Sequence, residues 1–415
     1  MPQLIVIGGG PAGMMAAVRA AELGAKVILF EKMRRTGRKL CLTGAGRCNL
    51  TNTLPTDEFI AAFGPTGKFL RQALSQFGSG NLIELVERLG VPAVTEPNGR
   101  VYPASNRAVD VVNAFTKWLD DNGVIIKSEF AVRELLIEND RVVGVQTDSD
   151  KFAADAVIVA TGGASYPETG SSGDGYKLAE MAGHSVVPIR PSLIPLETSG
   201  DIAPRLQGLS LPVVKLTIVI DEKKRNVENG ELLFTHYGVS GPVVLRISKQ
   251  VVDALRDKKV VSLSFDLLPD NDEHRLEQLI LDSAKQHGKR HIQNILEQWL
   301  PSRLASICLE LSAIKPDTLA NQLRSEHRRQ IVRILKDFRL HVSGHRPIAE
   351  AVVTAGGVDT REIDPRTMQS RLVKGLFFAG EVLDIDGASG GFNLQAAFST
   401  GWVAGCAAAG YLDSP

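Results

Sequence analysis

The stretch GRKLCLTGAGRCNLTN, residues 37–52, gathers residue types that can do chemistry at short spacing. Its glycines and the cations Arg38, Lys39 and Arg47 favour a backbone that lies close to an anionic group. Cys41 and Cys48 are compatible with a metal site, a redox pair or two small buried side chains. The elements that precede this stretch help to decide among these chemistries.

The N-terminus predicts a strand, a glycine-rich turn and a helix. Leu4–Ile7 is a continuous apolar run, as in a buried parallel strand, and Gly8, Gly10 and Gly13 supply the spacing G-x-G-x-x-G. In this motif the first glycine permits a tight turn, the second lets the backbone approach a pyrophosphate, and the third lets helix and strand pack closely. The alanine-rich helix, which runs to about Leu23, points unpaired N–H groups at the anion.

A second strand, Lys26–Phe30, ends at Glu31, an acid 18 residues after Gly13. A carboxylate at this point accepts hydrogen bonds from ribose hydroxyls and repels a 2′-phosphate. The sequence therefore predicts a site for the ADP half of FAD or NAD, and not of NADP.

Three later features favour FAD over NAD. Residues 124–150 alternate apolar and polar side chains with turn signals, which predicts a β-meander in place of a crossover helix. A buried strand ends in ATGG at 160–163, ahead of a glycine- and serine-rich loop and a helix. Far downstream, a strand ends in AGE at 379–381, and a last helix begins near Gly391 or Asn393. A strand that returns so late predicts an insertion within the nucleotide-binding domain.

These motifs resemble a known family. The glycine motif, the meander, ATGG and AGE follow the pattern of two-dinucleotide-binding-domain flavoproteins, such as those of fumarate reductase and succinate dehydrogenase. More specifically, TGRKLCLTGAGRCNLTN, GRVYPASNRA, ATGGASYPETGSSGDGY and FTHYGVSGPVVLRIS look like the YhiN/BaiN-like FAD-binding proteins, also called an aminoacetone oxidase family. The resemblance runs essentially from end to end. It implies noncovalent FAD, an inserted β-barrel-like and helical part, and activities that include amine oxidation and the reduction of steroid double bonds.

The resemblance also implies a set of cofactor-binding residues. For the pyrophosphate, the AMP ribose and the adenosine these are Gly8, Gly10, Pro11, Ala12, Gly13, Glu31, Lys32, Arg38 and Lys39. For the segment that passes towards the flavin ring they are Gly44, Gly46, Cys48, Asn49 and Leu50. The others are Val132 (adenine), Thr161 and Gly162 (the ATG turn), Gly380 and Glu381 (facing the ribityl chain), and Asn393, Leu394 and Gln395 (the helix start under the flavin).

The expected fold class is α/β, a Rossmann-like FAD-binding domain with a β-meander that an insertion interrupts. We expect the FAD-binding domain at 1–190 and 345–415, a β-rich inserted domain at 191–269 and a helical subdomain at 270–344. Within the insertion, IRPSLIPLETSG is interpreted as a crossing linker and DEKKRNVENG as a turn between strands.

Candidate catalytic residues are side chains that can bind substrate or move protons while the flavin carries out the redox step. His236 titrates near neutrality and suits a general acid or base, or a histidine that only holds its loop. Tyr102 and Tyr166 offer hydroxyls. Arg47 suits a substrate carboxylate, or only the stability of its own loop.

The two cysteines of the opening stretch fit no established motif. Six residues separate Cys41 from Cys48, which departs from the C-x4-C of flavoprotein disulfide reductases. No second cysteine pair or histidine cluster accompanies them, so no metal is predicted. Small buried side chains near the cofactor are favoured over a catalytic dithiol.

The charge and composition of the chain bear on whether it binds nucleic acid or membranes. Formal net charge is zero, from 47 Lys and Arg against 47 Asp and Glu, so no global attraction to nucleic acid or anionic membrane is expected. The basic run RSEHRRQIVRILKDFR favours a solvated helix face over a nucleic-acid surface. No apolar run is long enough to span a bilayer, and the few scattered cysteines fit a reducing compartment, so we expect a cytoplasmic protein.

The functional hypothesis is an FAD-dependent oxidoreductase. It transfers a hydride between flavin N5 and a small organic substrate, either an amine or a C=C/C–H bond as in enones. The other partner is O₂ or NAD(P)H, and NAD(P)H would bind transiently because the chain has no second glycine fingerprint. The alternative hypothesis is a flavoprotein that binds nucleic acid through the basic helical insertion and modifies tRNA.

Overall fold

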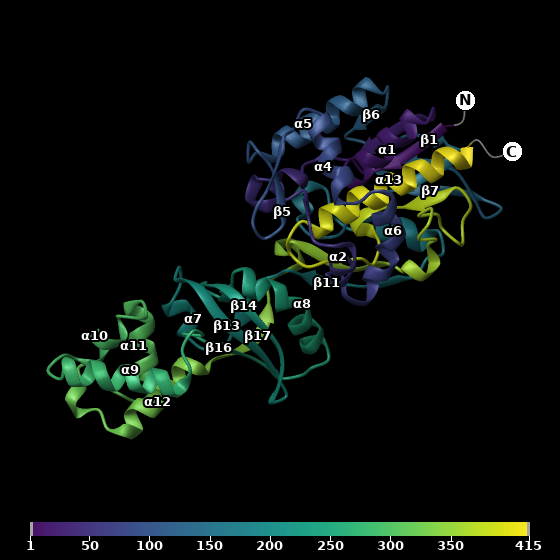
Figure 1. Ribbon diagram of the computed structural model, residues 1–415. Coiled ribbons are helices and arrows are strands. Elements are labelled where there is room, and N and C mark those ends of the chain that lie inside the picture. The colour runs from purple at the N-terminus through teal and green to yellow at the C-terminus, as the bar shows by residue number, and fades with distance from the viewer. Residues whose placement is uncertain (1–2, 413–415) are drawn as a thin grey trace. The chain divides into compact units, whose positions relative to one another are not determined.

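The computed structural model describes residues 3–412, which divide into two compact units (Figure 1). Unit 1 contains the chain up to Ser192 and from Ile348 onwards, and unit 2 is Leu193–Pro347. Each unit has its own cluster of buried apolar side chains. No helix among the described residues is long and apolar enough to cross a membrane.

Unit 1 is built on a parallel sheet of five strands. In spatial order they are β19 (Leu376–Phe378), β10 (Ala156–Val159), β1 (Gln3–Ile7), β2 (Lys26–Glu31) and β6 (Ile125–Ser128). The apolar runs of β1 and β10 are buried, as expected of central parallel strands. Because β19 pairs with β10, the insertion lies between two neighbouring strands of one sheet, which confirms the predicted α/β architecture.

Two helices of unit 1 approach each other where glycine replaces a side chain. They are α1 (Pro11–Glu22) and α13 (Phe392–Leu412), which lie side by side in Figure 1. A Cβ on Gly401 would lie 2.3 Å from the carbonyl oxygen of Ala12, and one on Gly405 would lie 2.5 Å from that of Ala16. Gly401 and Gly405 are one helical turn apart on α13, as are Ala12 and Ala16 on α1. The two helices therefore meet through faces of small residues. This packing joins the two ends of the chain.

Substituting Gly401 by alanine should therefore lower the free energy of unfolding, by about 1–3 kcal/mol, because the new methyl group overpacks the contact. Urea unfolding of the apo-protein measures the effect. Gly410→Ala on the same helix is the matched control, since a Cβ there meets nothing within 4 Å. Equal stability of the two variants would show that the helices are not in close contact.

Smaller elements of unit 1 surround the parallel sheet. Its other helices include α2 (Thr56–Ala61), α3 (Arg71–Gln76), α4 (Ser79–Arg88), α5 (Ala108–Asp121) and α6 (Asp174–Met181). A short antiparallel sheet consists of β3 (Thr51–Asn52), β5 (Arg100–Pro103) and β4 (Ala93–Thr95). The meander consists of β7 (Val132–Glu138), β8 (Arg141–Thr147) and β9 (Lys151–Ala153).

The meander is present, but it begins later than expected. Asn139 and Asp140 form the first turn, and both have positive φ, as a tight hairpin requires. The extension of the meander back to residue 124 was wrong, because β6 pairs in parallel with β2 at the edge of the main sheet. A partly exposed edge strand has the same alternating pattern as a meander strand, so periodicity could not separate them.

The chain leaves unit 1 along β11 (Val186–Ser192) and re-enters it along β18 (Val353–Val358), and these strands pair antiparallel. The stretch IRPSLIPLETSG crosses from unit 1 to unit 2, as predicted, because the units divide between Ser192 and Leu193. Its interpretation as a linker was wrong, since it forms the end of β11 and then β12 (Leu196–Thr198). The interpretation as a linker rested on Pro191 and Pro195, since proline is rare inside strands. β11 pairs on one side only, and proline is tolerated in such edge strands.

Unit 2 is a closed barrel with helices. The barrel strands, in spatial order, are β12, β15 (Gly238–Ser240), β14 (Lys223–Phe234), β13 (Ser210–Ile220), β16 (Val261–Asp266) and β17 (Phe338–His345). The helices include α7 (Ile202–Arg205), α8 (Pro242–Arg256), α9 (Glu273–Gln286), α10 (Ile292–Leu296), α11 (Ser302–Leu311) and α12 (Ser325–Lys336). One cluster of buried side chains runs through barrel and helices.

Only Asp221 and Glu222 form the turn in DEKKRNVENG, and both have positive φ. The other residues of that segment belong to β14, so its interpretation as a turn was wrong. The early part of β14 is exposed, and it therefore lacks the apolar alternation by which strands are recognised.

His184 connects distant parts of unit 1. Its buried ring has Nδ1 2.9 Å from Glu362 Oε2 and Nε2 2.8 Å from Ser370 Oγ. Ser370 Oγ also accepts N–H bonds from Leu372 and Val373, so the arrangement ties backbone segments together. Burial lowers the pKa of His184, and Glu362 opposes this only in part.

This lowered pKa predicts that stability decreases as the medium is acidified. Below about pH 6.5 the unfolded chain takes up a proton at His184 that the folded protein disfavours, so the free energy of unfolding falls as the pH falls. Urea unfolding between about pH 7.5 and about pH 5.5 measures this slope. His184→Gln should flatten it, and an unchanged slope in that variant would contradict the assignment.

Candidate cofactor and active site

The three glycines of the N-terminal motif serve different purposes. A Cβ on Gly8 would lie 2.5 Å from the carbonyl oxygen of Ala160, and one on Gly13 would lie 1.8 Å from that of Gly8. A Cβ on Gly10 would meet nothing within 4 Å. Gly10 is also the N-cap of α1 and provides no capping side chain. Open space in front of an uncapped helix N-terminus fits a pyrophosphate.

Glu31 connects the end of β2 to this glycine loop. Its carboxylate accepts N–H bonds from Gly9 (2.8 Å) and Met33 (2.7 Å). Burial raises the pKa of Glu31, while the two N–H bonds and the nearby charges of Lys32 and Arg38 act against that rise. The two oxygens keep further lone pairs that can accept from ribose hydroxyls.

Lys32 and Arg38 both follow β2 in the sequence, but they differ in their contacts. Lys32 forms an ion pair with Asp174 (2.5 Å) and a hydrogen bond to Ser172, at the start of α6. Burial, the largest single effect, would raise the pKa of Asp174, but the contacts with Lys32 and Ser172 and the charge of Arg133 together lower it. Arg38 is exposed.

Residues 44–50 follow a strained path towards the start of α13. Gly44, Gly46 and Cys48 all have positive φ. The Asn49 amide, with its oxygen facing the N–H of Gly391 (3.0 Å), donates to the carbonyl of Thr51 (3.1 Å). Leu50 is fully buried. This segment is therefore held against the C-terminal helix, as a path towards a shared cofactor requires.

The AGE turn packs directly on the first turn of α1. A Cβ on Gly380 would lie 2.8 Å from the Cβ of Ala12, and the Gly380 N–H donates to Thr400 Oγ1 on α13 (2.9 Å). Glu381 forms an ion pair with Lys39 (2.7 Å). The AGE turn, the glycine motif and the opening stretch therefore meet in unit 1.

The residues at the start of α13 have internal partners. Asn393 accepts from the N–H of Gly387 (2.8 Å) and donates back to its carbonyl (2.9 Å). Gln395 is fully buried and donates to the carbonyl of Phe77 (3.1 Å), and Leu394 is half-buried. The Asn393 and Gln395 side chains thus hold the start of α13 to neighbouring backbone segments of unit 1.

The remaining residues predicted to bind the cofactor lie in the ATG turn and at the start of the meander. Thr161 Oγ1 is buried and has no hydrogen-bond partner among the described residues. Gly162 has φ +74°, and a Cβ there would lie 3.2 Å from Ser171 Oγ. Val132 is the buried first residue of β7. A Cβ on Gly175 would lie 2.0 Å from Thr161 Oγ1, so this hydroxyl is enclosed by the protein's own atoms.

Two of the four catalytic candidates are in contact. The Arg47 guanidinium lies 3.9 Å from the ring centroid of Tyr102, and it also pairs with Glu96 (2.6 Å) and donates to Asn106 (2.8 Å). Tyr102 is 6% exposed, and its ring edge lies 3.2 Å from where a Gly44 Cβ would stand. Arg47 therefore belongs to the 44–50 segment, and Tyr102 packs against this segment at Gly44.

The other two catalytic candidates are separate. Tyr166 follows the ATGG turn in unit 1, with φ +52° and its N–H bonded to the carbonyl of Ala349 (3.2 Å). His236 belongs to unit 2, where its exposed ring contacts Tyr237 at 4.9 Å. Arg346 stacks on the same Tyr237 at 4.6 Å, a contact that sequence reasoning missed because it joins distant segments of unit 2.

Of the four cysteines, Cys48 and Cys308 are buried, and Cys41 and Cys406 are half-buried. All four are free. Burial raises the pKa of Cys48 to about 12 and also raises that of Cys41, which disfavours the reactive thiolate. Within residues 3–412 no group of three or more His, Cys, Asp or Glu is placed to hold a metal ion.

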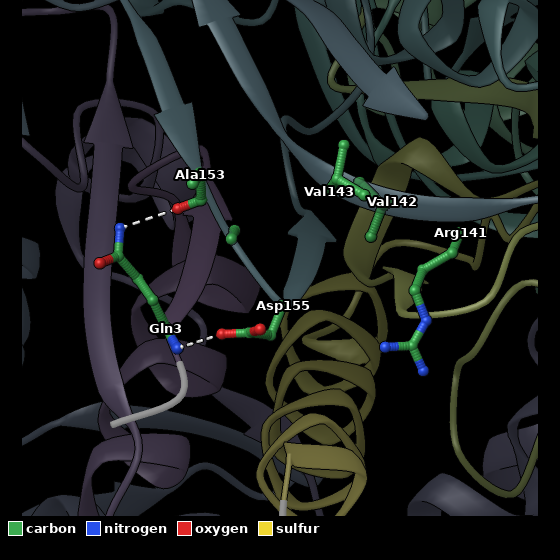
Figure 2. Close-up of a pocket in the computed structure, with 7 residues that line it drawn as sticks. Gln3, Arg141, Val142, Val143, Ala153 and Asp155 are labelled. Atoms are coloured by element: carbon green, nitrogen blue, oxygen red, sulfur yellow. Dashed lines mark hydrogen bonds between the residues drawn. The ribbon is translucent and has the colours of Figure 1, made fainter. Parts of the chain in front are cut away.

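A hollow of about 290 Å³ in unit 1 lies elsewhere (Figure 2). Gln3 begins β1, Asp155 precedes β10 and Arg141 begins β8, so this hollow is at the amino ends of the parallel strands. Nucleotides bind at the opposite, carboxyl edge of such sheets, where Gly8 and Glu31 lie. The hollow is therefore not the cofactor site.

Comparison with known proteins identifies the family. A family model described as HI0933-like protein Rossmann domain matches residues 2–407. The chain belongs to this family. The protein is accordingly an FAD-dependent oxidoreductase, and the predicted YhiN/BaiN-like membership, enzyme class and FAD are confirmed.

Two curated relatives span nearly the whole chain. The 3-dehydro-bile acid delta(4,6)-reductase of Clostridium scindens is 32% identical over 411 residues, 99% of each chain. The ribosomal RNA dihydrouridine synthase of Escherichia coli is 32% identical over 399 residues, 96% of each chain.

Solved structures support the fold. A 3-ketosteroid delta1-dehydrogenase from Sterolibacterium denitrificans matches with TM-score 0.55 and 12% identity over 99% of this chain and 100% of that one. An open-conformation flavocytochrome c3 fumarate reductase matches with TM-score 0.53 and 17% identity over 100% of this chain and 79% of that one.

Gly10 offers a direct test of the cofactor site. Gly10→Val places its side chain in open space, so the apo-protein should keep its melting temperature while FAD affinity falls by about tenfold or more, a loss of at least about 1.4 kcal/mol. Fluorescence titration of apo-protein with FAD measures this. Gly13→Val is the contrasting variant, because its Cβ meets the Gly8 carbonyl and should lower stability itself. Undiminished FAD binding by Gly10→Val would place the pyrophosphate elsewhere.

Proposed function

We propose that the protein is a reductase of carbon–carbon double bonds conjugated with a carbonyl group, with NAD(P)H as the electron donor. FAD, when bound, supplies the hydride from N5 to the carbon β to the carbonyl. A proton added at the α carbon completes the saturated product. The observation that carries the proposal is the FAD cradle of unit 1, in a chain with near-full-length relatives of two kinds whose names imply this one chemistry.

The chemistry is common to two very different substrates. A 3-dehydro-bile acid with delta(4,6) unsaturation has C=C bonds conjugated with its 3-keto group. Uridine has a C=C bond conjugated with a ring carbonyl, and its reduction gives dihydrouridine. In both, the carbonyl oxygen becomes electron-rich as hydride arrives, so nearby N–H donors or cations stabilise the transition state. Neither relative's name supports an amine as the substrate, and the proposal is therefore restricted to conjugated C=C bonds.

Arg47 and Tyr102 are the residues of this chain best placed to assist. The Arg47 guanidinium is held by Glu96 and stacked on Tyr102 beside Gly44, on the segment expected to reach the flavin. Arg47 would stabilise the developing oxyanion, and the Tyr102 hydroxyl would give or relay the proton. Tyr166 and His236 remain further candidates for the proton donor.

The direct test uses the reduced, anaerobic protein. A 3-keto-4,6-diene steroid acid should reoxidise the flavin, as followed by recovery of its visible absorbance, because its double bonds are polarised. The same steroid with the 3-keto group reduced to an alcohol is the control and should not. Reoxidation by both compounds, or bleaching of the oxidised protein by amines in place of any enone reaction, would contradict the proposal.

A uridine within ribosomal RNA is a second candidate substrate, favoured by the uneven charge of the two units. Residues 193–347 hold 23 Lys and Arg against 19 Asp and Glu, whereas the rest of the chain holds 24 against 28. Arg324, directly before α12, and Arg329 and Arg333 on α12 are exposed. Lys336 is paired internally with Asp266 (2.5 Å), so only part of the basic run is available to an RNA backbone.

Replacing Arg324, Arg329 and Arg333 together by glutamate separates the two substrates. If RNA is the substrate, the variant should lose dihydrouridine formation in rRNA transcripts and show a weaker dependence of RNA binding on salt, because fewer phosphates are contacted. Turnover of the steroid enone should be unchanged. Unaltered RNA modification by the variant would exclude α12 as the contact surface.

A further inference from the structure

Lys39 has a different partner from the one its sequence context suggests. It follows the second strand among cations expected beside the phosphates, but its Nζ lies 2.7 Å from Glu381 Oε2 and 2.7 Å from Ser165 Oγ. The Lys39 and Glu381 side chains are only 21% and 20% exposed. Solvent and salt screen an ion pair of this kind less than a surface pair.

Glu381 is held at both carboxylate oxygens. While Oε2 accepts from Lys39, Oε1 accepts from the N–H of Thr354 (2.7 Å). Thr354 Oγ1 in turn accepts from the N–H groups of Ala164 (2.9 Å) and Ser165 (3.2 Å), which follow the ATGG turn. The network therefore joins four segments of unit 1 that are far apart in sequence.

Gly163 shows that the fold makes room for this network. A Cβ on Gly163 would lie 2.4 Å from Thr354 Oγ1 and 3.1 Å from the carboxyl carbon of Glu381. The last glycine of ATGG is thus required by the Thr354 and Glu381 side chains. A side chain at this position would displace the carboxylate that Lys39 neutralises.

We propose that Lys39 is the counter-ion of Glu381 and raises the redox potential of the bound FAD, and that it is not a phosphate ligand. Glu381 matches the motif that faces the cofactor's ribityl chain. Reduction adds negative charge to the flavin, which an uncompensated carboxylate nearby disfavours and a paired one does not. Lys39 is in this sense a positioning residue that acts through Glu381. The inference rests on FAD binding by unit 1 and is independent of the substrate.

Redox titration of the FAD-loaded protein, without substrate, provides the test. Lys39→Met should lower the midpoint potential, because the Glu381 carboxylate loses its counter-ion. A tenfold loss in the preference for reduced over oxidised FAD corresponds to about 30 mV for a two-electron couple. Glu381→Gln should raise the potential, and the double variant Lys39→Met/Glu381→Gln should return it close to wild type. Lys39→Arg keeps the charge and should stay near the wild-type value.

The control is Lys117→Met, which removes the lysine of an exposed ion pair with Asp121 on α5 and should not move the potential. FAD affinity and the melting temperature of each apo-variant are measured in parallel, so that a folding defect is recognised independently of the potential. If Lys39→Met weakens oxidised and reduced FAD equally, and Glu381→Gln does not compensate, Lys39 is a phosphate ligand and the proposal is overturned. A potential that is unchanged in every variant would overturn it equally.

Discussion

The close packing of α1 on α13 is the constraint on which the rest of unit 1 depends. Gly401 and Gly405 let the C-terminal helix approach the backbone of Ala12 and Ala16 at a distance that any side chain would prevent. The same approach places Gly380 against Ala12 and brings the start of α13 to Asn49. The cofactor cradle is therefore assembled from both ends of the chain, although the 155 residues of unit 2 separate the strands that carry its parts.

The glycines of this cradle are of two kinds. At some an added Cβ would clash with the protein's own atoms, and at others it would enter open space. Gly8, Gly13 and Gly163 are surrounded by the protein's own atoms, whereas Gly10 opens on free space in front of α1. Open space alone is common among the glycines of this chain, so it is the combination of Gly10's open space with the uncapped N-terminus of α1 that supports an anion site there. The network of Lys39, Glu381 and Thr354 pairs the charge of the AGE turn, and we propose that Lys39 serves Glu381 and not a phosphate.

Much of the fold of unit 1 was predictable from the sequence, because the elements β1, α1 and β2 follow from local sequence patterns. The apolar run of β1, the glycine spacing and the acid at the end of β2 together indicate a dinucleotide site, and the resemblance extended them to the FAD site. Prediction failed where the deciding contact is distant or where two structures share one pattern. The pairing of β6 with β2, the strand character of β14 and the partners of Lys39 and Gln395 depend on segments that periodicity cannot connect. Zero net charge likewise concealed a basic unit 2 and an acidic unit 1.

The central claim is that both ends of the chain form one FAD site in unit 1. A crystal structure of the FAD-bound protein tests it most directly. The account predicts the pyrophosphate in front of Gly10 at the N-terminus of α1, the AMP ribose at Glu31, and the flavin against the start of α13, with the Lys39–Glu381 pair intact. FAD bound at the hollow beside Gln3 and Arg141, or a purified protein that takes up no flavin, would contradict it.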